Sequence, residues 1–167
     1  MEFKLKPKVG VYIDGANLFY QGKRSGFMID YKKLYGWVAQ ESDIVVAKYF
    51  IGQPSWEPAK SLNEAFNKYI KKIGYSIITK PLKKLKTKDG VIKNKCNFDV
   101  EMHDEVIHDM DKLDIVYLVS GDSDFMRTKE RILSKKKKIK FLAYKKGCSW
   151  EIRMSWADPA RMWRARR

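Results

Sequence analysis

The sequence predicts an α/β fold, in which a central and mostly parallel sheet is covered by helices on both faces. Two observations lead to this prediction. Short runs rich in β-branched residues alternate along the chain with amphipathic stretches. The short runs are almost continuously apolar, which is typical of strands buried on both faces. Strands and helices that alternate in this way form parallel sheets with right-handed crossovers.

The apolar runs define five expected strands. Each is short and is followed by polar or turn-forming residues. The expected strands cover residues 9–13, 44–51, 75–79, 115–120 and 139–143.

The amphipathic stretches between the strands define four expected helices, at residues 31–39, 57–73, 100–110 and 125–133. Asp30 precedes the first of them and is expected to cap it. The second has a helical spacing of apolar residues, which predicts one buried face. The residues of that face are Leu62, Phe66, Tyr69, Ile70 and Ile73.

One basic segment, at about residues 82–95, interrupts this alternation. Its Asp89-Gly90 pair favours a two-residue hairpin turn, so we expect a basic hairpin or flap beside the sheet. Lysines also cluster at 135–138, and arginines cluster near the end of the chain, at Arg161, Arg164, Arg166 and Arg167. A single run of charge is more often a solvated face than a binding site, but three such runs favour a polyanionic partner.

The overall composition supports one folded domain over residues 1–167. Hydrophobic residues make up 44% and aromatic residues 13% of the chain, which argues against disorder. There are 35 Lys and Arg against 20 Asp and Glu, for a net charge of +15. Nucleic acid is the favoured partner for such a charge, ahead of a membrane surface or an acidic protein.

Localisation follows from what the sequence lacks. No apolar run approaches the roughly 20 residues needed to span a bilayer, and the first residues do not resemble a secretory signal. We therefore expect a cytoplasmic protein that does not enter membranes. Cys96 and Cys148 form no recognisable pattern, and we assign them no function.

Acidic residues follow two of the expected strands and start one expected helix. Asp14 ends the first strand, Asp122 and Asp124 follow the strand at 115–120, and Asp99 starts the helix at 100–110. The carboxyl ends of parallel strands meet at one edge of the sheet, where ligands usually bind. Oxygen ligands suit Mg²⁺ or Mn²⁺. We therefore expect a divalent metal site that meets a polyanion and hydrolyses phosphodiester bonds.

A structural role for the same aspartates is the alternative. Asp is common in turns and at the first residue of helices, and Asp14 or Asp99 alone would more often be structural than catalytic. The agreement of three separate places along the chain is what favours the metal site.

Three motifs resemble those of NYN domains, a branch of the PIN-like nuclease superfamily. They are the segments at residues 12–18, 95–102 and 118–125, and residues 149–158 resemble the closing stretch of the family. The resemblance covers most of the chain. It implies a Rossmann-like, PIN-type, three-layer α/β/α fold with Mg²⁺ or Mn²⁺ at an acidic cluster. It also implies cleavage of RNA that leaves 5′-phosphate and 3′-hydroxyl ends.

The resemblance also implies roles for single residues. The metal ligands and catalytic acids would be Asp14, Asp99, Asp122 and Asp124. Asn17 would share their pocket and hold a water or a phosphate oxygen, and Ser120 would orient a carboxylate. One position departs from the family, because Glu105 stands where an Asp is usual. This leaves the role of Glu105 and the number of metal ions open.

The leading prediction is therefore a metal-dependent endoribonuclease with RNA as its substrate. Lysines of the basic hairpin would hold the RNA backbone: Lys83, Lys84, Lys86, Lys88, Lys93 and Lys95. Phe19 and Tyr20 are placed to meet a base. The alternative is a catalytically weak or inactive RNA-binding or protein-interaction module of the same fold, which the Glu105 departure favours. The oligomeric state, including a homodimer, is open.

Overall fold

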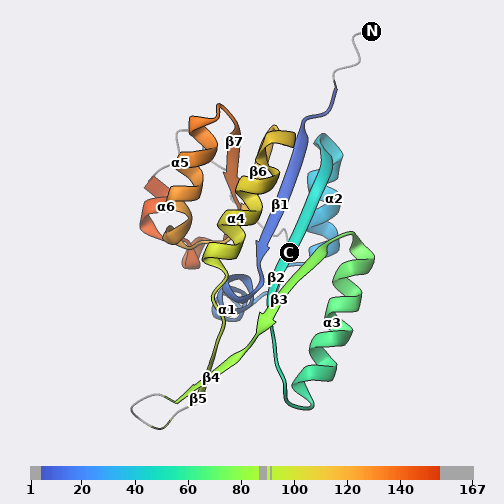
Figure 1. The fold of residues 1–167 in the computed structure, drawn as a ribbon, viewed down its shortest axis with the longest axis vertical. Helices are drawn as coiled ribbons and strands as arrows, with labels where there is room; N and C mark the ends of the chain where they lie inside the picture. Colours follow the sequence, from blue (N-terminus) through green and yellow to red (C-terminus); the bar gives the residue numbers. More distant parts are fainter. Residues whose placement is uncertain (1–4, 87–89, 91, 155–167) are drawn as a thin grey trace.

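The computed structural model describes residues 5–86, 90 and 92–154. Within these ranges, five parallel strands form a central sheet in the order β3-β2-β1-β6-β7 (Figure 1). The strands are β1 (Lys8–Asp14), β2 (Asp43–Gln53), β3 (Ser76–Pro81), β6 (Ile115–Val119) and β7 (Lys138–Phe141). All five expected strands are present, and the predicted parallel sheet is confirmed.

Helices cover both faces of this sheet. The first face carries α1 (Gly15–Ser25), α2 (Tyr31–Glu41) and α3 (Ala59–Ile73), and the second carries α4 (Asp99–Asp109), α5 (Met126–Ser134) and α6 (Trp150–Met154). Short 3₁₀ helices are η1 (Met110–Lys112), η2 (Ser123–Phe125) and η3 (Lys145–Gly147). The predicted three-layer α/β/α architecture is confirmed.

The central strand β1 is buried on both faces because its side chains enter two separate cores. Val11 and Ile13 pack in the core under α1, α2 and α3, whereas Tyr12 packs in the core under α4 and α5. All three are fully buried. A strand of this kind gains free energy from apolar side chains at every position, which explains the continuous apolar run in the sequence.

The order of the strands reverses between β1 and β6. From β1 the chain passes to β2 and β3 on one side of the sheet, and later to β6 and β7 on the other. At such a reversal the connections leave in opposite directions, so a crevice opens beyond the carboxyl ends of the two strands. Asp14 and the turn after Val119 lie at this place.

The basic hairpin consists of β4 (Lys83–Lys86) and β5 (Ile92–Lys95), which pair antiparallel and extend away from the sheet (Figure 1). The base of the hairpin is packed against β2, since a Cβ on Gly52 would lie 2.7 Å from Leu82 Cδ1 and 3.0 Å from Cys96 Cβ. In addition, Lys84 Nζ lies 3.9 Å from the centroid of the Trp56 ring. The base of the hairpin is therefore fixed to the body of the protein.

Helix α3 buries a narrower stripe than the sequence predicted. Ile70 is fully buried, and Phe66 and Ile73 pack partly against the core, but Leu62 is 68% and Tyr69 47% exposed. The prediction for Leu62 and Tyr69 is therefore wrong. The first turns of α3 extend past the ends of β2 and β3 (Figure 1), so they have no sheet to cover.

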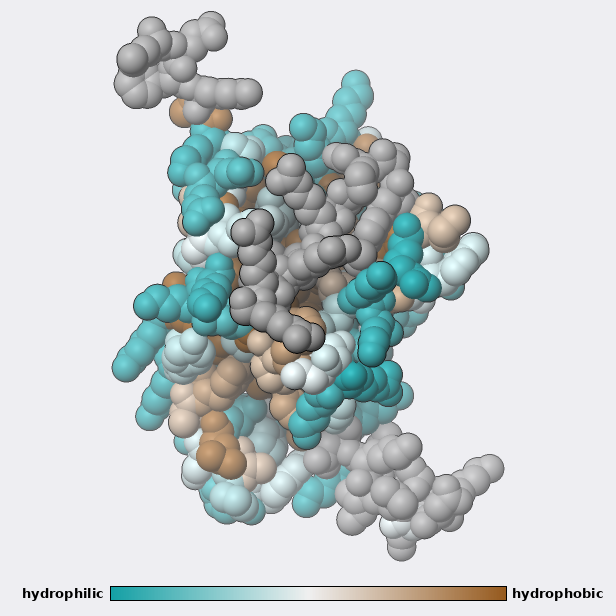
Figure 2. Space-filling model, turned by 180° about the vertical axis from the view of Figure 1, so that it is seen from behind, coloured by the Kyte–Doolittle hydropathy of each residue, from teal (hydrophilic) through white to brown (hydrophobic). Residues whose placement is uncertain are grey.

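The surface opposite to the view of Figure 1 is mainly hydrophilic, with smaller hydrophobic patches between the hydrophilic side chains (Figure 2). Lysines 135–138 lie at the start of β7, because Lys138 pairs with Ile115, the first residue of β6. They are thus at the edge of the sheet opposite to Asp14. The arginines at 161–167 lie outside the described ranges.

Candidate metal centre

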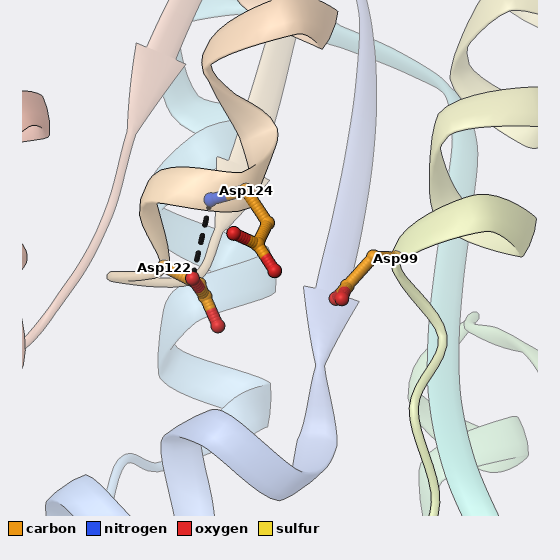
Figure 3. Close-up of side chains that lie close together, drawn as sticks. All are labelled: Asp99, Asp122 and Asp124. Carbon is orange, nitrogen blue, oxygen red and sulfur yellow. Dashed lines mark hydrogen bonds between the residues drawn. The ribbon is translucent and has the colours of Figure 1, made fainter.

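Three separate parts of the chain bring acidic side chains to the carboxyl edge of the sheet. β1 ends at Asp14, and α1 starts at the next residue. β6 ends at Val119, and the following turn carries Asp122 and Asp124 into η2. The segment after β5 leads into α4, which begins at Asp99. In Figure 3 the side chain of Asp99 faces those of Asp122 and Asp124 across the gap between α4 and η2.

The side chains of Asp99, Asp122 and Asp124 form the closest acidic group. Each offers one carboxylate oxygen, and these oxygens all lie within 4.8 Å of one another. Opposite ligands of a Mg²⁺ ion are roughly 4 Å apart, since its bonds to oxygen are about 2.0–2.1 Å long. The donor set consists only of carboxylate oxygens, which hard cations prefer. The three residues therefore fit a small divalent cation after a slight contraction.

Short-range hydrogen bonds hold these three residues in place. Asp122 caps η2, and its Oδ1 accepts from the backbone N–H of Asp124 at 3.2 Å (Figure 3). The backbone N–H of Asp99 donates to Oδ1 of Asn97 at 2.8 Å. Each carboxylate thus extends from a turn whose backbone is already ordered by a side-chain hydrogen bond. This order reduces the entropy that is lost when a ligand binds.

Asp14 lies beside this group rather than within it. Its Oδ1 accepts from the backbone N–H of Asn17 at 3.0 Å and caps α1, while its Oδ2 accepts from Ser120 Oγ at 3.2 Å. In the part of the chain that the structure describes, the group of oxygens within 4.8 Å leaves Asp14 out. The structural and functional interpretations of Asp14 are therefore compatible, because capping occupies only part of its carboxylate.

Ser120 and Asn17 connect the two strand ends. Ser120 is fully buried; its Oγ donates to Asp14 and accepts from the backbone N–H of Asp122 at 3.3 Å. Asn17 Oδ1 accepts from the backbone N–H of Gly121 at 3.1 Å. We expected the amide of Asn17 to hold a water or a phosphate oxygen, and here its Oδ1 accepts from the backbone. These bonds fix the turn after β6 relative to the start of α1.

The electrostatics of the centre disfavour full ionisation without a cation. Burial raises the pKa of Asp14, and the charges of Asp99 and Asp122 raise it further, although bonds from Asn17 and Ser120 act in the opposite direction. Burial also raises the pKa of Asp99, as do the neighbouring charges of Asp122 and Asp124, against the effect of a hydrogen bond with Asn97. A bound cation would remove this penalty.

Glu105 is engaged elsewhere. Lys48, on β2, forms ion pairs with both Glu105 and Asp109. Asp109 also pairs with Lys112 at 2.8 Å and accepts from the hydroxyl of Tyr12 at 3.0 Å. Among the described residues, Glu105 is therefore not part of the group formed by Asp99, Asp122 and Asp124. A lysine inside an otherwise apolar strand was the sequence signal for this network, and our sequence analysis missed it.

The lysines of the hairpin are only partly described. Lys83, Lys84 and Lys95 are exposed, and Lys84 stacks on Trp56. Lys83 pairs with Lys95 in the antiparallel register. Like charges directly opposite each other destabilise a hairpin unless an anion lies between them. Lys86 and Lys93 are described in backbone only, and Lys88 lies outside the described residues.

Phe19 and Tyr20 lie on α1, within two turns of Asp14. They are 43% and 54% exposed, and their ring centroids are 5.5 Å apart. Lys23 Nζ lies 4.7 Å from the centroid of the Phe19 ring. Exposed rings beside a cation provide a surface on which bases can stack.

None of the helices in the described ranges is both long enough and apolar enough to cross a membrane.

Comparison with known proteins gives three similarities. The family model described as NYN domain matches residues 8–156. The low amplitude and bright protein LabA of Synechococcus elongatus is 25% identical over 136 residues, which cover 79% of this chain and 71% of LabA. The crystal structure of a protein of unknown function from Vibrio parahaemolyticus superimposes with a TM-score of 0.75 at 26% identity, over 92% of this chain and 91% of that one.

Proposed function

Because this chain belongs to the NYN domain family, we propose that it is a metal-dependent endoribonuclease whose Mg²⁺ or Mn²⁺ is held by the acidic group at the carboxyl edge of the sheet. Asp99, Asp122 and Asp124 are the proposed ligands. Asp14, whose Oδ2 accepts a hydrogen bond from Ser120, is the proposed fourth ligand.

One observation carries this proposal: the three grouped aspartates have no lysine or arginine partner among the ion pairs of the described residues. Other acids of α4 are paired, since Glu101, near its start, contacts Lys80, and Asp109, at its end, contacts Lys48 and Lys112. In a chain with a net charge of +15, lysine partners are abundant. A group of like charges that lacks them is best explained by a cation.

The side chains would divide the work as follows. A bound divalent cation neutralises phosphate charge and activates a water for attack on phosphorus. Asp99, Asp122 and Asp124 would hold the cation in place. Ser120 would orient Asp14, and Asn17 would fix the turn that carries Asp122, so that the ligands need little rearrangement when RNA binds.

RNA is the proposed substrate because cationic and aromatic surface adjoins the centre. Lys83 and Lys95 face each other on the hairpin, and a phosphate between them would relieve their repulsion. Phe19 and Tyr20 would stack on bases. We retain Lys84, Lys86, Lys88 and Lys93 as further backbone contacts in this proposal.

A second candidate function is an RNA-binding or protein-interaction module of the same fold with weak or no catalysis. The ion pair between Lys48 and Glu105 favours it, because it removes one acid from the neighbourhood of the cation. In this case the metal would bind without supporting turnover.

Cleavage of a labelled single-stranded RNA tests the proposal. The wild-type protein is assayed with Mn²⁺, Mg²⁺ or EDTA, beside an Asp99→Asn, Asp122→Asn double variant. Asp30→Asn is the matched control, because Asp30 also caps a helix but lies outside the acidic group. We expect cleavage that needs the metal, persists in the control and disappears in the double variant. Binding of RNA without cleavage under any metal would support the second candidate, and equal cleavage by all proteins would indicate a contaminant.

A further inference from the structure

A hydrogen bond outside the acidic group joins α4, which begins at Asp99, to α5, which follows η2 and its Asp124 directly. His103 on α4 and Thr128 on α5 are linked at 2.9 Å between Nδ1 and Oγ1. Thr128 is 1% exposed, and His103 is partly buried. Neither residue belongs to the proposed ligands or to the RNA-contacting surface.

The spacing of these residues along their helices matches that of the aspartates. His103 is four residues after Asp99, and Thr128 is four residues after Asp124. Residues four apart lie on the same face of a helix, about one turn or 6 Å along its axis. His103 therefore lies one turn after Asp99 on α4. Thr128 lies in the first turn of α5, which follows η2 and its Asp124 directly, so the bond joins the two segments next to the aspartates and further from the carboxyl edge.

The remaining contacts between these segments do not set their separation in the same way. At the edge, Asp99 and Asp124 carry like charges whose carboxylate oxygens lie within 4.8 Å of each other, so they repel. Behind the bond, Val106 and Ile132 share an apolar core, and apolar packing is not directional. A hydrogen bond is directional and fixes the distance between its two atoms within a few tenths of an ångström.

The choice of threonine supports a polar role at this position. A buried hydroxyl costs free energy unless it is hydrogen-bonded, and threonine is a weaker helix former than many apolar residues. Packing alone would be served equally well by valine, which has the same shape. The hydroxyl of Thr128 therefore contributes through its bond to His103.

We propose that His103 and Thr128 are positioning residues, whose hydrogen bond sets the separation of α4 and α5 and thereby the spacing of Asp99 and Asp124 for a divalent cation. This inference rests on the proposed metal site. Neither residue touches the cation or the RNA. His103 acts through α4, which begins at Asp99, and Thr128 acts through α5, which continues from η2 and its Asp124.

Two pairs of variants test this inference. Thr128→Val and His103→Leu remove the bond. Thr128→Ser keeps the hydroxyl, and His103→Asn keeps a polar atom at the place of Nδ1. The affinity for Mn²⁺ is measured by isothermal titration calorimetry, and the unfolding of the metal-free proteins by urea denaturation. We expect the first pair to bind Mn²⁺ about tenfold more weakly and the second pair to bind within about twofold of the wild type.

RNA cleavage provides a further readout, in which the first pair should lower kcat and leave KM nearly unchanged, since the RNA contacts lie elsewhere. Wild-type affinity in Thr128→Val and His103→Leu would overturn the positioning role and leave the metal site intact. Equal weakening in all four variants would show that packing matters instead of the bond, which also overturns it. A wild-type protein that binds no Mn²⁺ would overturn both this inference and the function on which it rests.

Discussion

Asp122→Asn should stabilise the metal-free protein and abolish most of its stabilisation by a metal. The amide oxygen of Asn can still accept from the backbone N–H of Asp124, so the cap of η2 is retained. The substitution removes one charge from the acidic group. It therefore separates the electrostatic cost of the centre from its contribution to local structure.

The expected magnitude follows from the spacing of the carboxylates. Two unit charges 4.8 Å apart repel by about 1 kcal/mol in the dielectric of water. Asp122 forms such pairs with Asp99 and with Asp124, and we reduce the sum to about 1 kcal/mol because Asp124 is exposed and salt screens it. For a chain of this length, such a gain raises Tm by about 2–4 °C.

Thermal unfolding measures both effects. The wild type and Asp122→Asn are heated in EDTA and again with Mn²⁺ at about one hundred times its Kd, where binding stabilises the wild type by about 2.7 kcal/mol. The ranking of the two proteins should therefore reverse between the two conditions. Asp30→Asn is the control and should behave as the wild type in both, since its carboxylate only caps α2.

Two results would refute this reasoning. A lower Tm for Asp122→Asn in EDTA would show that the carboxylate makes favourable contacts that outweigh its repulsion. Equal stabilisation of both proteins by Mn²⁺ would show that the cation binds at another place.

Three further predictions concern stability and RNA binding. Asp109→Asn should lower the free energy of unfolding by about 3 kcal/mol at about pH 7. Burial alone would raise the pKa of Asp109, but its lysine and tyrosine partners hold that pKa below its usual range. The stability that the carboxylate contributes is therefore present above its unfolded pKa and is lost as pH falls through the folded one. Urea denaturation at about pH 7 and pH 3 should therefore show a difference that shrinks in acid, and a constant difference would contradict it. Gly121→Ala should destabilise the protein by about 1–3 kcal/mol, because the new Cβ would lie 2.5 Å from the carbonyl oxygen of Gly147. Gly36→Ala should stabilise it by about 0.5–1 kcal/mol in the same assay, because Gly36 lies inside α2 with open space around it. Changing Lys83 and Lys95 to Gln should weaken RNA binding and reduce its salt slope by about 1.4 on a logarithmic plot, and an unchanged slope would exclude phosphate contacts by these two lysines.

The sheet and the edge that carries the acids could be predicted because both depend on local patterns. The continuous apolar run before Asp14 predicted a strand buried on both faces, and the run before Asp122 predicted another. Parallel strands place their carboxyl ends together, so the approach of Ser120 to Asp14 follows from the topology. Asp99 reaches Asp122 from the start of α4, which does not follow a strand of this sheet. The resemblance to NYN domains is confirmed by the match over residues 8–156.

Helix α1 was not predicted, because its local sequence argues against a helix. It starts directly after β1 without a loop, and it contains Gly15 and Gly22, which lower helix propensity. The tertiary structure requires both glycines. A Cβ at Gly15 would lie 2.6 Å from the carbonyl oxygen of Phe50, and one at Gly22 would lie 2.9 Å from the hydroxyl of Tyr144. Close packing has outweighed propensity here.

The position of Glu105 could not be predicted from a motif, because its partner Lys48 is 57 residues away in the sequence. The same holds for the stacking of Lys84 on Trp56, which depends on how the loop before α3 meets the hairpin. Charge patterns predict that lysines and acids are present on a surface. They do not specify which of them pair after folding.

Three helical segments start at the acidic centre: α1 after Asp14, α4 at Asp99, and η2, which continues into α5, after Asp122. The start of a helix carries a partial positive charge of up to about half an elementary charge, because its peptide dipoles are aligned. Three such dipoles directed at the aspartates offset part of their repulsion. The chain can therefore fold with its aspartates in place before it meets a cation, in contrast to domains that unfold when their metal is removed. In the proposed function, the cation would therefore be required for the chemistry and not for the fold.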